Sequence, residues 1–129
     1  MSTIGPFDAA SVEAYASASG DSNPIHVAAD AAAAAGLAAP IVQGMLVMGH
    51  MVRLAEAWQT DAEVCSAKIL FARPVSVGES LRVDGRVVDD GDATPAWRCT
   101  LRLVARNVGG TVVALVDVVL ADAAGQVTA

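Results

Sequence analysis

The chain has 129 residues, enough for one domain with a real core but few for a substrate pocket enclosed by a single chain. Its formal charge of −6 excludes nucleic acid as a partner, because phosphate backbones are bound by basic surfaces. Apolar residues make up 54% of the sequence, which is high for a soluble monomer and predicts a homodimer that buries part of them.

Three helices are predicted in the first half of the chain. At 9–19, Asp8 can cap the N–H groups of the first turn, and Gly20 can adopt the left-handed conformation that ends a helix. A short alanine-rich helix follows at 30–35. The strongest pattern is at 44–58, where apolar residues surround most of the circumference, which predicts a helix buried on most sides.

The second half of the chain changes to the period of strands, which are predicted at 64–71, 81–88, 97–106 and 111–120. In the third strand apolar residues from Trp97 onward alternate with arginines, so one face is core and the other is wet, as in an antiparallel sheet. The last strand is apolar on both faces except at Asp117, which predicts a central or interface strand. Turns are predicted between the strands, one of them at 89–92. A long helix followed by an antiparallel meander fits a sheet wrapped around a helix.

Neither a membrane span nor a secretory signal is expected. The longest apolar stretches, at 31–42 and 45–52, are interrupted and fall short of the roughly 18 residues that a spanning helix needs. The start of the chain lacks a basic region followed by an apolar one. Cys65 and Cys99 lie in strand-like segments without CxxC spacing, so we expect buried thiols and no zinc site, although a disulfide is left open. A cytoplasmic protein is predicted.

The most specific motif is the loop Gly-Asp-Ser-Asn-Pro-Ile-His at 20–26, which places Asp21 and His26 five residues apart. Pro24 has no N–H and pushes the residue before it toward extended geometry, so a continuous helix is excluded and both side chains can turn toward one point. A carboxylate and an imidazole aimed at one water are what acid–base addition or removal of water requires. A structural Asx-type turn is the alternative, and the downstream segment 40–45 favours the catalytic interpretation.

Residues 15–26 and 40–46, with the sequences YASASGDSNPIH and PIVQGML, resemble the hydratase signature of the MaoC-like (R)-specific enoyl-CoA hydratases and 3-hydroxyacyl-thioester dehydratases. A second patch at 71–75 resembles the segment where that family enters its next strand. The resemblance covers nearly the whole chain. It implies a single hotdog domain over 1–129, an α+β fold in which an antiparallel sheet wraps around a long helix.

The resemblance also implies roles for particular residues. Asp21 and His26 would hold the water and move its proton, without a metal or cofactor. The N–H of Gly44, at a helix start, would stabilise negative charge on a thioester oxygen. Asn23 and Gln43 are the expected substrate-binding residues, and Asn23 is expected to orient the loop as well. Gln43 stands where relatives often carry a histidine, and the helix that Gly44 begins contains no Ser or Thr, although some relatives place a helper hydroxyl there.

The implied reaction is the reversible hydration of a trans-2-enoyl thioester to the (R)-3-hydroxyacyl thioester. CoA is the expected carrier rather than acyl carrier protein, because an acidic carrier would meet an acidic protein. Which of Arg53, Lys68, Arg73 or the strand arginines binds the carrier phosphates is left open. Two alternatives remain. The intact loop argues against a hotdog acyl-CoA thioesterase, and the intact Asp–His pair argues against a non-catalytic partner subunit of a heteromeric dehydratase.

Overall fold

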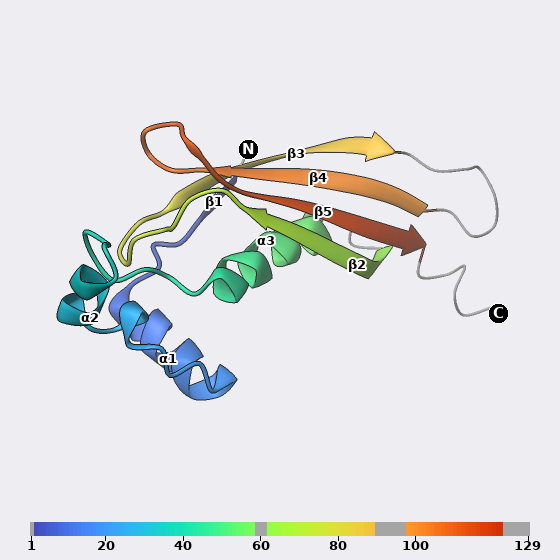
Figure 1. Ribbon diagram of the computed structural model, residues 1–129. Coiled ribbons are helices and arrows are strands. Elements are labelled where there is room, and N and C mark those ends of the chain that lie inside the picture. The colour runs from blue at the N-terminus through green and yellow to red at the C-terminus, as the bar shows by residue number, and fades with distance from the viewer. Residues whose placement is uncertain (1, 59–61, 90–97, 123–129) are drawn as a thin grey trace.

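The computed structural model describes residues 2–58, 62–89 and 98–122, in which a five-stranded antiparallel sheet lies over one long helix (Figure 1). All neighbouring strands pair antiparallel. This is the α+β hotdog architecture that the sequence predicts. Across the sheet the strands lie in the order β1 (Ser2–Ile4), β3 (Leu81–Asp89), β4 (Arg98–Arg106), β5 (Val112–Asp122) and β2 (Ala62–Phe71).

The long helix α3 (Gly44–Trp58) has the predicted bounds and lies beneath the inner face of the sheet (Figure 1). Val47, Met51 and Ala55 lie four residues apart and form one fully buried stripe. Each buried valine or methionine in it contributes about 1.5–3 kcal/mol relative to an exposed one. The prediction of burial on most sides is wrong for the single chain, because one sheet covers only one side of the helix and Met45 is 57% exposed.

The inner face of the sheet supplies the other half of the core. Alternate residues of β4 are buried, as predicted: Cys99, Leu101, Leu103 and Ala105. The prediction that the last strand is central is confirmed, since β5 pairs with β4 on one edge and β2 on the other. Asp117 of β5 accepts hydrogen bonds from Arg102 of β4 at 2.8 and 3.0 Å. This bidentate pair holds the pKa of Asp117 below its usual value.

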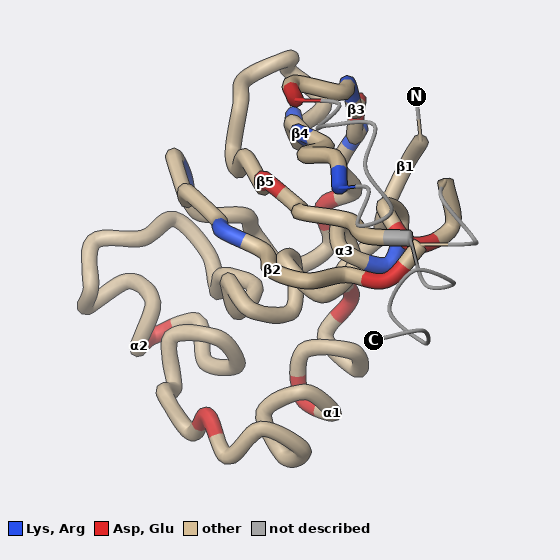
Figure 2. Tube along the Cα trace, turned by 90° about the vertical axis from the view of Figure 1, so that its right-hand side faces the viewer, with Lys and Arg blue, Asp and Glu red and all other residues tan. Residues whose placement is uncertain are grey.

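The outer face of the sheet carries most of the chain's cations. The strand registers place Lys68, Asp117, Arg102 and Arg86 in one row across four strands. Arg82 and Arg106 lie opposite each other on the same face. This is the solvent-exposed face that the alternation in the sequence predicts. Figure 2 shows Lys and Arg on the strands, whereas the charged residues of the helices at 9–19 and 29–34 are all acidic.

Helix α1 (Ala9–Ser19) and the short helix α2 (Ala29–Ala34) lie on the side of the molecule at which α3 begins (Figure 1). The predicted caps of α1 are confirmed. Oδ1 of Asp8 accepts from the N–H of Ser11 at 2.8 Å, and Gly20 has a φ of 78°. No helix in the described ranges has the length and hydropathy to cross a bilayer.

The sequence does not predict β1 and misplaces one cysteine. β1 has only three residues, too few for an alternating pattern, and it forms because it pairs with β3. Cys65 is exposed rather than buried, because it lies where the register of β2 shifts between Val64 and Ser66. Cys99 is buried as predicted. Trp97 and most of the predicted turn at 89–92 lie outside the described residues.

Candidate active site

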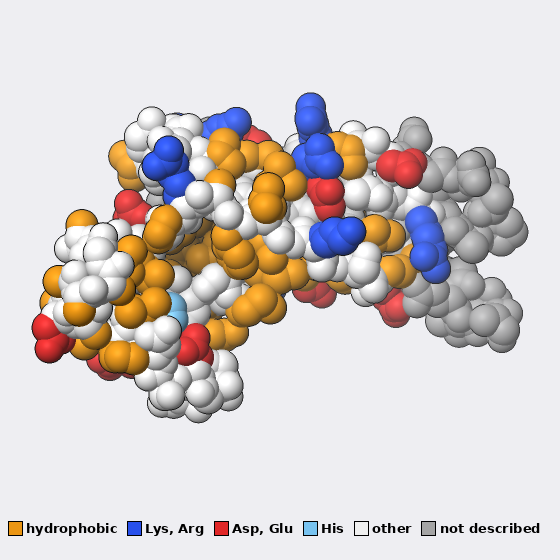
Figure 3. All heavy atoms as spheres, viewed as in Figure 1, with side chains coloured by type: hydrophobic (Ala, Val, Ile, Leu, Met, Phe, Trp, Pro, Cys, Tyr) orange, Lys and Arg blue, Asp and Glu red, His pale blue; other side chains and the backbone are white. Residues whose placement is uncertain are grey.

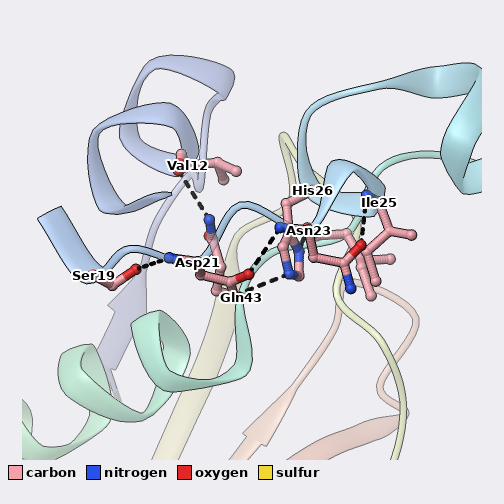
Figure 4. A network of polar contacts seen from close by, with 8 residues as sticks. Val12, Ser19, Asp21, Asn23, Ile25, His26 and Gln43 are labelled. Atoms are coloured by element: carbon pink, nitrogen blue, oxygen red, sulfur yellow. Dashed lines mark hydrogen bonds and ion pairs between the residues drawn. The ribbon is translucent and has the colours of Figure 1, made fainter. Parts of the chain in front are cut away.

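The loop after α1 holds its shape through short polar contacts (Figure 4). The N–H of Asp21 donates to Oγ of Ser19 at 3.2 Å, and the N–H of Asn23 donates to Oδ1 of Asp21 at 3.1 Å. Oδ1 of Asn23 accepts from the N–H of Ile25 and so caps a single 3₁₀ turn, η1 (Pro24–His26). Proline begins this turn, where its missing N–H costs no hydrogen bond. The loop therefore excludes a continuous helix, as predicted, but ends in one turn of 3₁₀ helix.

The loop brings Asp21 and His26 together. Nε2 of His26 lies 3.4 Å from Oδ2 of Asp21, and the imidazole is 9% exposed against 39% for the carboxylate. Nδ1 of His26 lies 2.7 Å from the carbonyl oxygen of Ile41. A carbonyl only accepts, so Nδ1 carries the hydrogen, and a neutral ring turns the lone pair of Nε2 toward the carboxylate. The lone pair of Nε2 and the negative carboxylate repel each other. A proton placed between Nε2 and Oδ2 replaces this repulsion with a charge-assisted hydrogen bond.

A cavity of about 710 Å³ opens beside the pair, and Asp21 belongs to its lining. Most of the lining is apolar, and Figure 3 shows hydrophobic side chains gathered around this hollow. The cavity is assembled from α1, the loop, the start of α3, the end of β2 and β5. Its lining includes Tyr15, Ser19, Ile41, Val42, Gln43, Gly44, Met45, Val47, Phe71, Arg73, Val75 and Val113. An apolar hollow that exposes a carboxylate suits a small ligand with an acyl chain.

Gly44 begins α3 at the edge of this cavity. The N–H groups of Leu46 and Val47 donate to the carbonyl of Gln43, whereas those of Gly44 and Met45 find no acceptor among the described residues. Backbone N–H groups at a helix start attract negative charge, because they lie at the positive end of the helix dipole. The start of α3 is therefore suited to attract an anion, and it lies at the cavity that also exposes the carboxylate of Asp21.

The ring of Phe71 lies directly against Gly44. A Cβ built on Gly44 would fall 2.6 Å from Cζ of this ring, so no larger residue fits while the ring stays in place. The sequence gives Phe71 no role in the site. Its contact with Gly44 joins β2 to α3, and no local pattern marks such a contact.

Gln43 is 2% exposed, and its Nε2 donates to the carbonyl of Val12 in α1 at 3.0 Å. Its Oε1 is buried and has no hydrogen-bond partner among the described residues. Two other predicted site residues do not belong to the lining of the cavity. Asn23 is not part of its lining, and neither is His26, which borders a second cavity of about 60 Å³. His26 therefore meets the main cavity through Asp21.

The other histidine lies apart from this pair. His50, in the middle of α3, packs edge-on against Phe7 with ring centroids 5.1 Å apart. Burial, assisted by the nearby charge of Arg53, lowers the pKa of His50. In the described parts of the chain no three His, Cys, Asp or Glu side chains converge as a metal site would require.

Comparisons with known proteins identify the family of the chain and agree with its fold. Residues 3–107 match the family model of the MaoC like domain. The (R)-hydratase from A. caviae involved in PHA biosynthesis is 26% identical, with a TM-score of 0.82 over 92% of this chain and 91% of that one. The ChsH1-ChsH2 complex from Mycobacterium tuberculosis shares the fold, at 21% identity and a TM-score of 0.80 over 94% of this chain and 91% of that chain.

Among curated proteins, the fatty acid synthase subunit beta of Gibberella zeae is 41% identical over 73 residues, which are 54% of this chain and 4% of that protein. The chain spans less than half the length of each curated relative that it matches.

Proposed function

The chain belongs to the MaoC-like domain family, and we propose that it catalyses the reversible hydration of a trans-2-enoyl thioester to the (R)-3-hydroxyacyl thioester. The observation that carries this proposal is the Asp21–His26 pair at the edge of an apolar cavity, beside the N–H groups that begin α3. Family membership supports hydratase or dehydratase chemistry, which needs a proton acceptor, a proton donor and a group that stabilises an enolate.

In the proposed reaction, water binds at Asp21 on the cavity side of the pair. The oxygen of the water adds to C3, and one of its protons passes to the Asp21–His26 pair. A proton from the pair goes to C2 on the same face, so the pair returns to its starting state and the product gains one OH and one H. His26 acts through Asp21, and its Nδ1–H bond to Ile41 keeps Nε2 directed at the carboxylate.

Addition at C3 places negative charge on the thioester oxygen. The N–H of Gly44 is suited to receive this charge, since it has no acceptor among the described residues and lies at the positive end of a 15-residue helix. Donors of this kind are fixed before the reaction and stabilise charge as it develops.

CoA is the proposed carrier, and Arg73 is the cation we assign to its phosphates. Of the basic residues that the sequence left open, Arg73 belongs to the lining of the cavity. The strand arginines and Lys68 follow the outer face of the sheet, and Arg102 is already paired with Asp117. Arg73 is exposed and forms no ion pair with another described residue, so its guanidinium is available to a phosphate.

We also propose a homodimer that completes the cavity. The edge strand β2 is 10 residues long and, within the described residues, pairs only with β5. Apolar side chains on β2 and α3 are exposed: Met45 at 57%, Trp58 at 36%, Leu70 at 66% and Phe71 at 47%. Long apolar edges of this kind are covered in native proteins, and antiparallel pairing of two β2 strands would extend the sheet. A heteromeric partner with the same fold is the alternative occupant.

Replacement of the pair tests the function. Asp21→Asn and His26→Ala should each lower kcat for crotonyl-CoA hydration by about two to four orders of magnitude, because each removes a proton-transfer group. His50→Gln is the matched control and should leave kcat within about threefold, since His50 contacts Phe7 instead. Near-normal turnover by either pair variant would exclude the assignment.

The same assay separates the alternatives. A thioesterase would release free CoA, which a thiol reagent detects, without forming the 3-hydroxy product. A partner subunit would be inactive alone and would gain activity only with a second chain.

A further inference from the structure

The outer face of the sheet carries two pairs of arginines that lie directly opposite each other on neighbouring strands. Arg82 of β3 lies opposite Arg106 of β4, and Arg86 lies opposite Arg102. Figure 2 shows basic positions gathered along these two strands. Like charges directly opposite each other destabilise a sheet, because their Cβ atoms are only about 5 Å apart. Of the four arginines, only Arg102 forms an ion pair with a described residue, Asp117. Anions from another molecule would relieve the remaining repulsion.

A row of apolar side chains crosses the strands between the two arginine pairs. Val104 of β4 lies opposite Leu115 of β5, which lies opposite Leu70 of the edge strand β2. Leu70 is 66% exposed, and the other two are half-buried. Successive side chains on one face of a strand are about 6.7 Å apart, so cations flank the row at this distance. We call these residues the outer patch: Leu70, Val104 and Leu115 with Lys68, Arg82, Arg86, Arg102 and Arg106.

We propose that the outer patch binds an acidic amphipathic helix of another protein, laid across the strands. Neighbouring strands are about 4.8 Å apart and helix turns about 5.4 Å, so apolar side chains on successive turns meet Val104, Leu115 and Leu70 in succession. An extended segment repeats its side chains on one face only every ~6.7 Å and does not match this spacing. A helix is about 10–12 Å wide, so carboxylates on both flanks of its apolar stripe reach the arginines on either side. Asp84, opposite Val104 at the β3 end of the row, favours the positive N-terminal end of the helix there.

The charge of the whole chain favours a small partner. Its formal net charge is −6, so an anionic bilayer or a nucleic acid, which extends beyond the outer patch, is repelled by the rest of the surface. The outer patch also lies on the opposite face from the cavity. The ring of Phe71 points to Gly44 and lines the cavity, and Leu70 next to it in β2 points the other way. The helix therefore docks without entering the site, and the proposal does not depend on the proposed function.

A synthetic helical peptide of about 18 residues tests the proposal, a length at which a helix can form alone. It carries leucines along one face and glutamates on both flanks, and the anisotropy of a fluorescent label reports binding to the full chain. A control peptide has the same composition in shuffled order, so that its leucines surround the helix. The amphipathic peptide should bind at least about tenfold tighter than the control, and its affinity should fall as salt is added.

Charge reversal on β3 separates docking from the stability of the fold. Arg82→Glu and Arg86→Glu should each weaken binding of the amphipathic peptide at least about threefold, and together about tenfold. Each variant places opposite charges across the two strands, so the Tm of the free protein should rise by about 1–4 °C. Val104→Thr keeps the branched shape and should weaken binding about threefold, because it removes apolar surface. Arg53→Glu on α3 is the control with the same change in net charge, and it should keep the affinity within about twofold.

Several outcomes would overturn the proposal. They are equal binding of the two peptides, no binding at ~1 mM peptide, and an equal loss of affinity in Arg53→Glu and Arg86→Glu. A fall of the Tm in both β3 variants would show that the arginines serve the fold, and would also overturn it. Vesicles of phosphatidylcholine and phosphatidylserine are the second probe. Binding to them that is tighter than binding to the peptide, and that is lost in the same β3 variants, would identify a lipid surface in place of a helix-docking site.

Discussion

Gly44→Ala is the smallest change that tests how the start of α3 is packed. The new Cβ would fall 2.6 Å from Cζ and 3.0 Å from Cε1 and Cε2 of Phe71. Carbon atoms in contact lie about 3.5–4 Å apart, so the ring must move by about 1 Å. Phe71 is 47% exposed in the single chain, which gives its ring room to move there. We therefore expect a destabilisation of about 1 kcal/mol, the low end of the range for overpacking.

Activity should fall for the same reason. Phe71 and Gly44 share the lining of the cavity, so a displaced ring changes the space that receives the thioester. A larger residue at 44 would therefore hinder the thioester both directly and through the displaced ring of Phe71. Gly44→Val, with two further methyl groups, should lower kcat/KM at least about tenfold, equivalent to ~1.4 kcal/mol of transition-state stabilisation.

A double-mutant cycle isolates the contact. Phe71→Ala should recover about 1 kcal/mol of stability in the Gly44→Ala background, measured by urea unfolding. Gly49→Ala is the control in the same helix. A Cβ there meets nothing within 4 Å, so this change should stabilise α3 by up to about 1 kcal/mol. Effects of Gly44→Ala and Phe71→Ala that simply add would refute the proposed packing.

Three further predictions follow from the structure. Light scattering at micromolar concentration should give a homodimer, and Leu70→Lys on the exposed edge strand should weaken it, whereas a stable active monomer would contradict the proposed assembly. His50 has a lowered pKa in the folded chain, so stability should fall as pH drops below about 6.5, and His50→Gln should flatten this slope in thermal melts; parallel curves would refute the contribution. Asp117 also has a lowered pKa, so its pair with Arg102 stabilises the fold above about pH 4 and is lost in stronger acid, and Asp117→Asn should reduce the acid-induced loss of stability.

The parts of the fold that sequence predicts are those fixed by local chemistry. The bounds of α3 follow from an apolar run that begins at a glycine, and the caps of α1 follow from Asp8 and Gly20. The proximity of Asp21 and His26 follows from five residues of loop with a proline between them. In each case the determinants lie within one or two turns of each other.

The parts that escaped prediction depend on contacts between distant segments. The Nε2 bond of Gln43 reaches Val12, 31 residues away, and leaves Oε1 buried without a donor among the described residues. The ring of Phe71 meets Gly44 only because β2 ends beside the start of α3. β1 exists only through its pairing with β3. None of these contacts leaves a periodic pattern in the sequence, since periodicity records which side of an element is buried and not what it meets.

The two segments that form the candidate site contribute different kinds of chemical group. The loop at 20–26 contributes the carboxylate and imidazole, whereas the segment 41–44 contributes main-chain groups and one amide. The carbonyl of Ile41 orients His26. The N–H of Ile41 donates to the carbonyl of Ile25 at 3.1 Å, so the segment 41–44 holds the loop at 20–26 in place.

The segment 41–44 is itself fixed by backbone contacts with residues 75 and 76, which follow β2. The N–H of Val42 binds the carbonyl of Val75 at 2.7 Å, and Ile41 forms a bridge with Ser76. Two residues further on, the N–H of Gly44 begins α3. Any shift of this short segment would change the imidazole, the amide and the helix start together. The distance from the Asp21–His26 pair to the N–H of Gly44, which the proposed reaction requires, is therefore set by backbone hydrogen bonds, which tolerate many side chains at 41 and 42 as long as the main chain keeps its course.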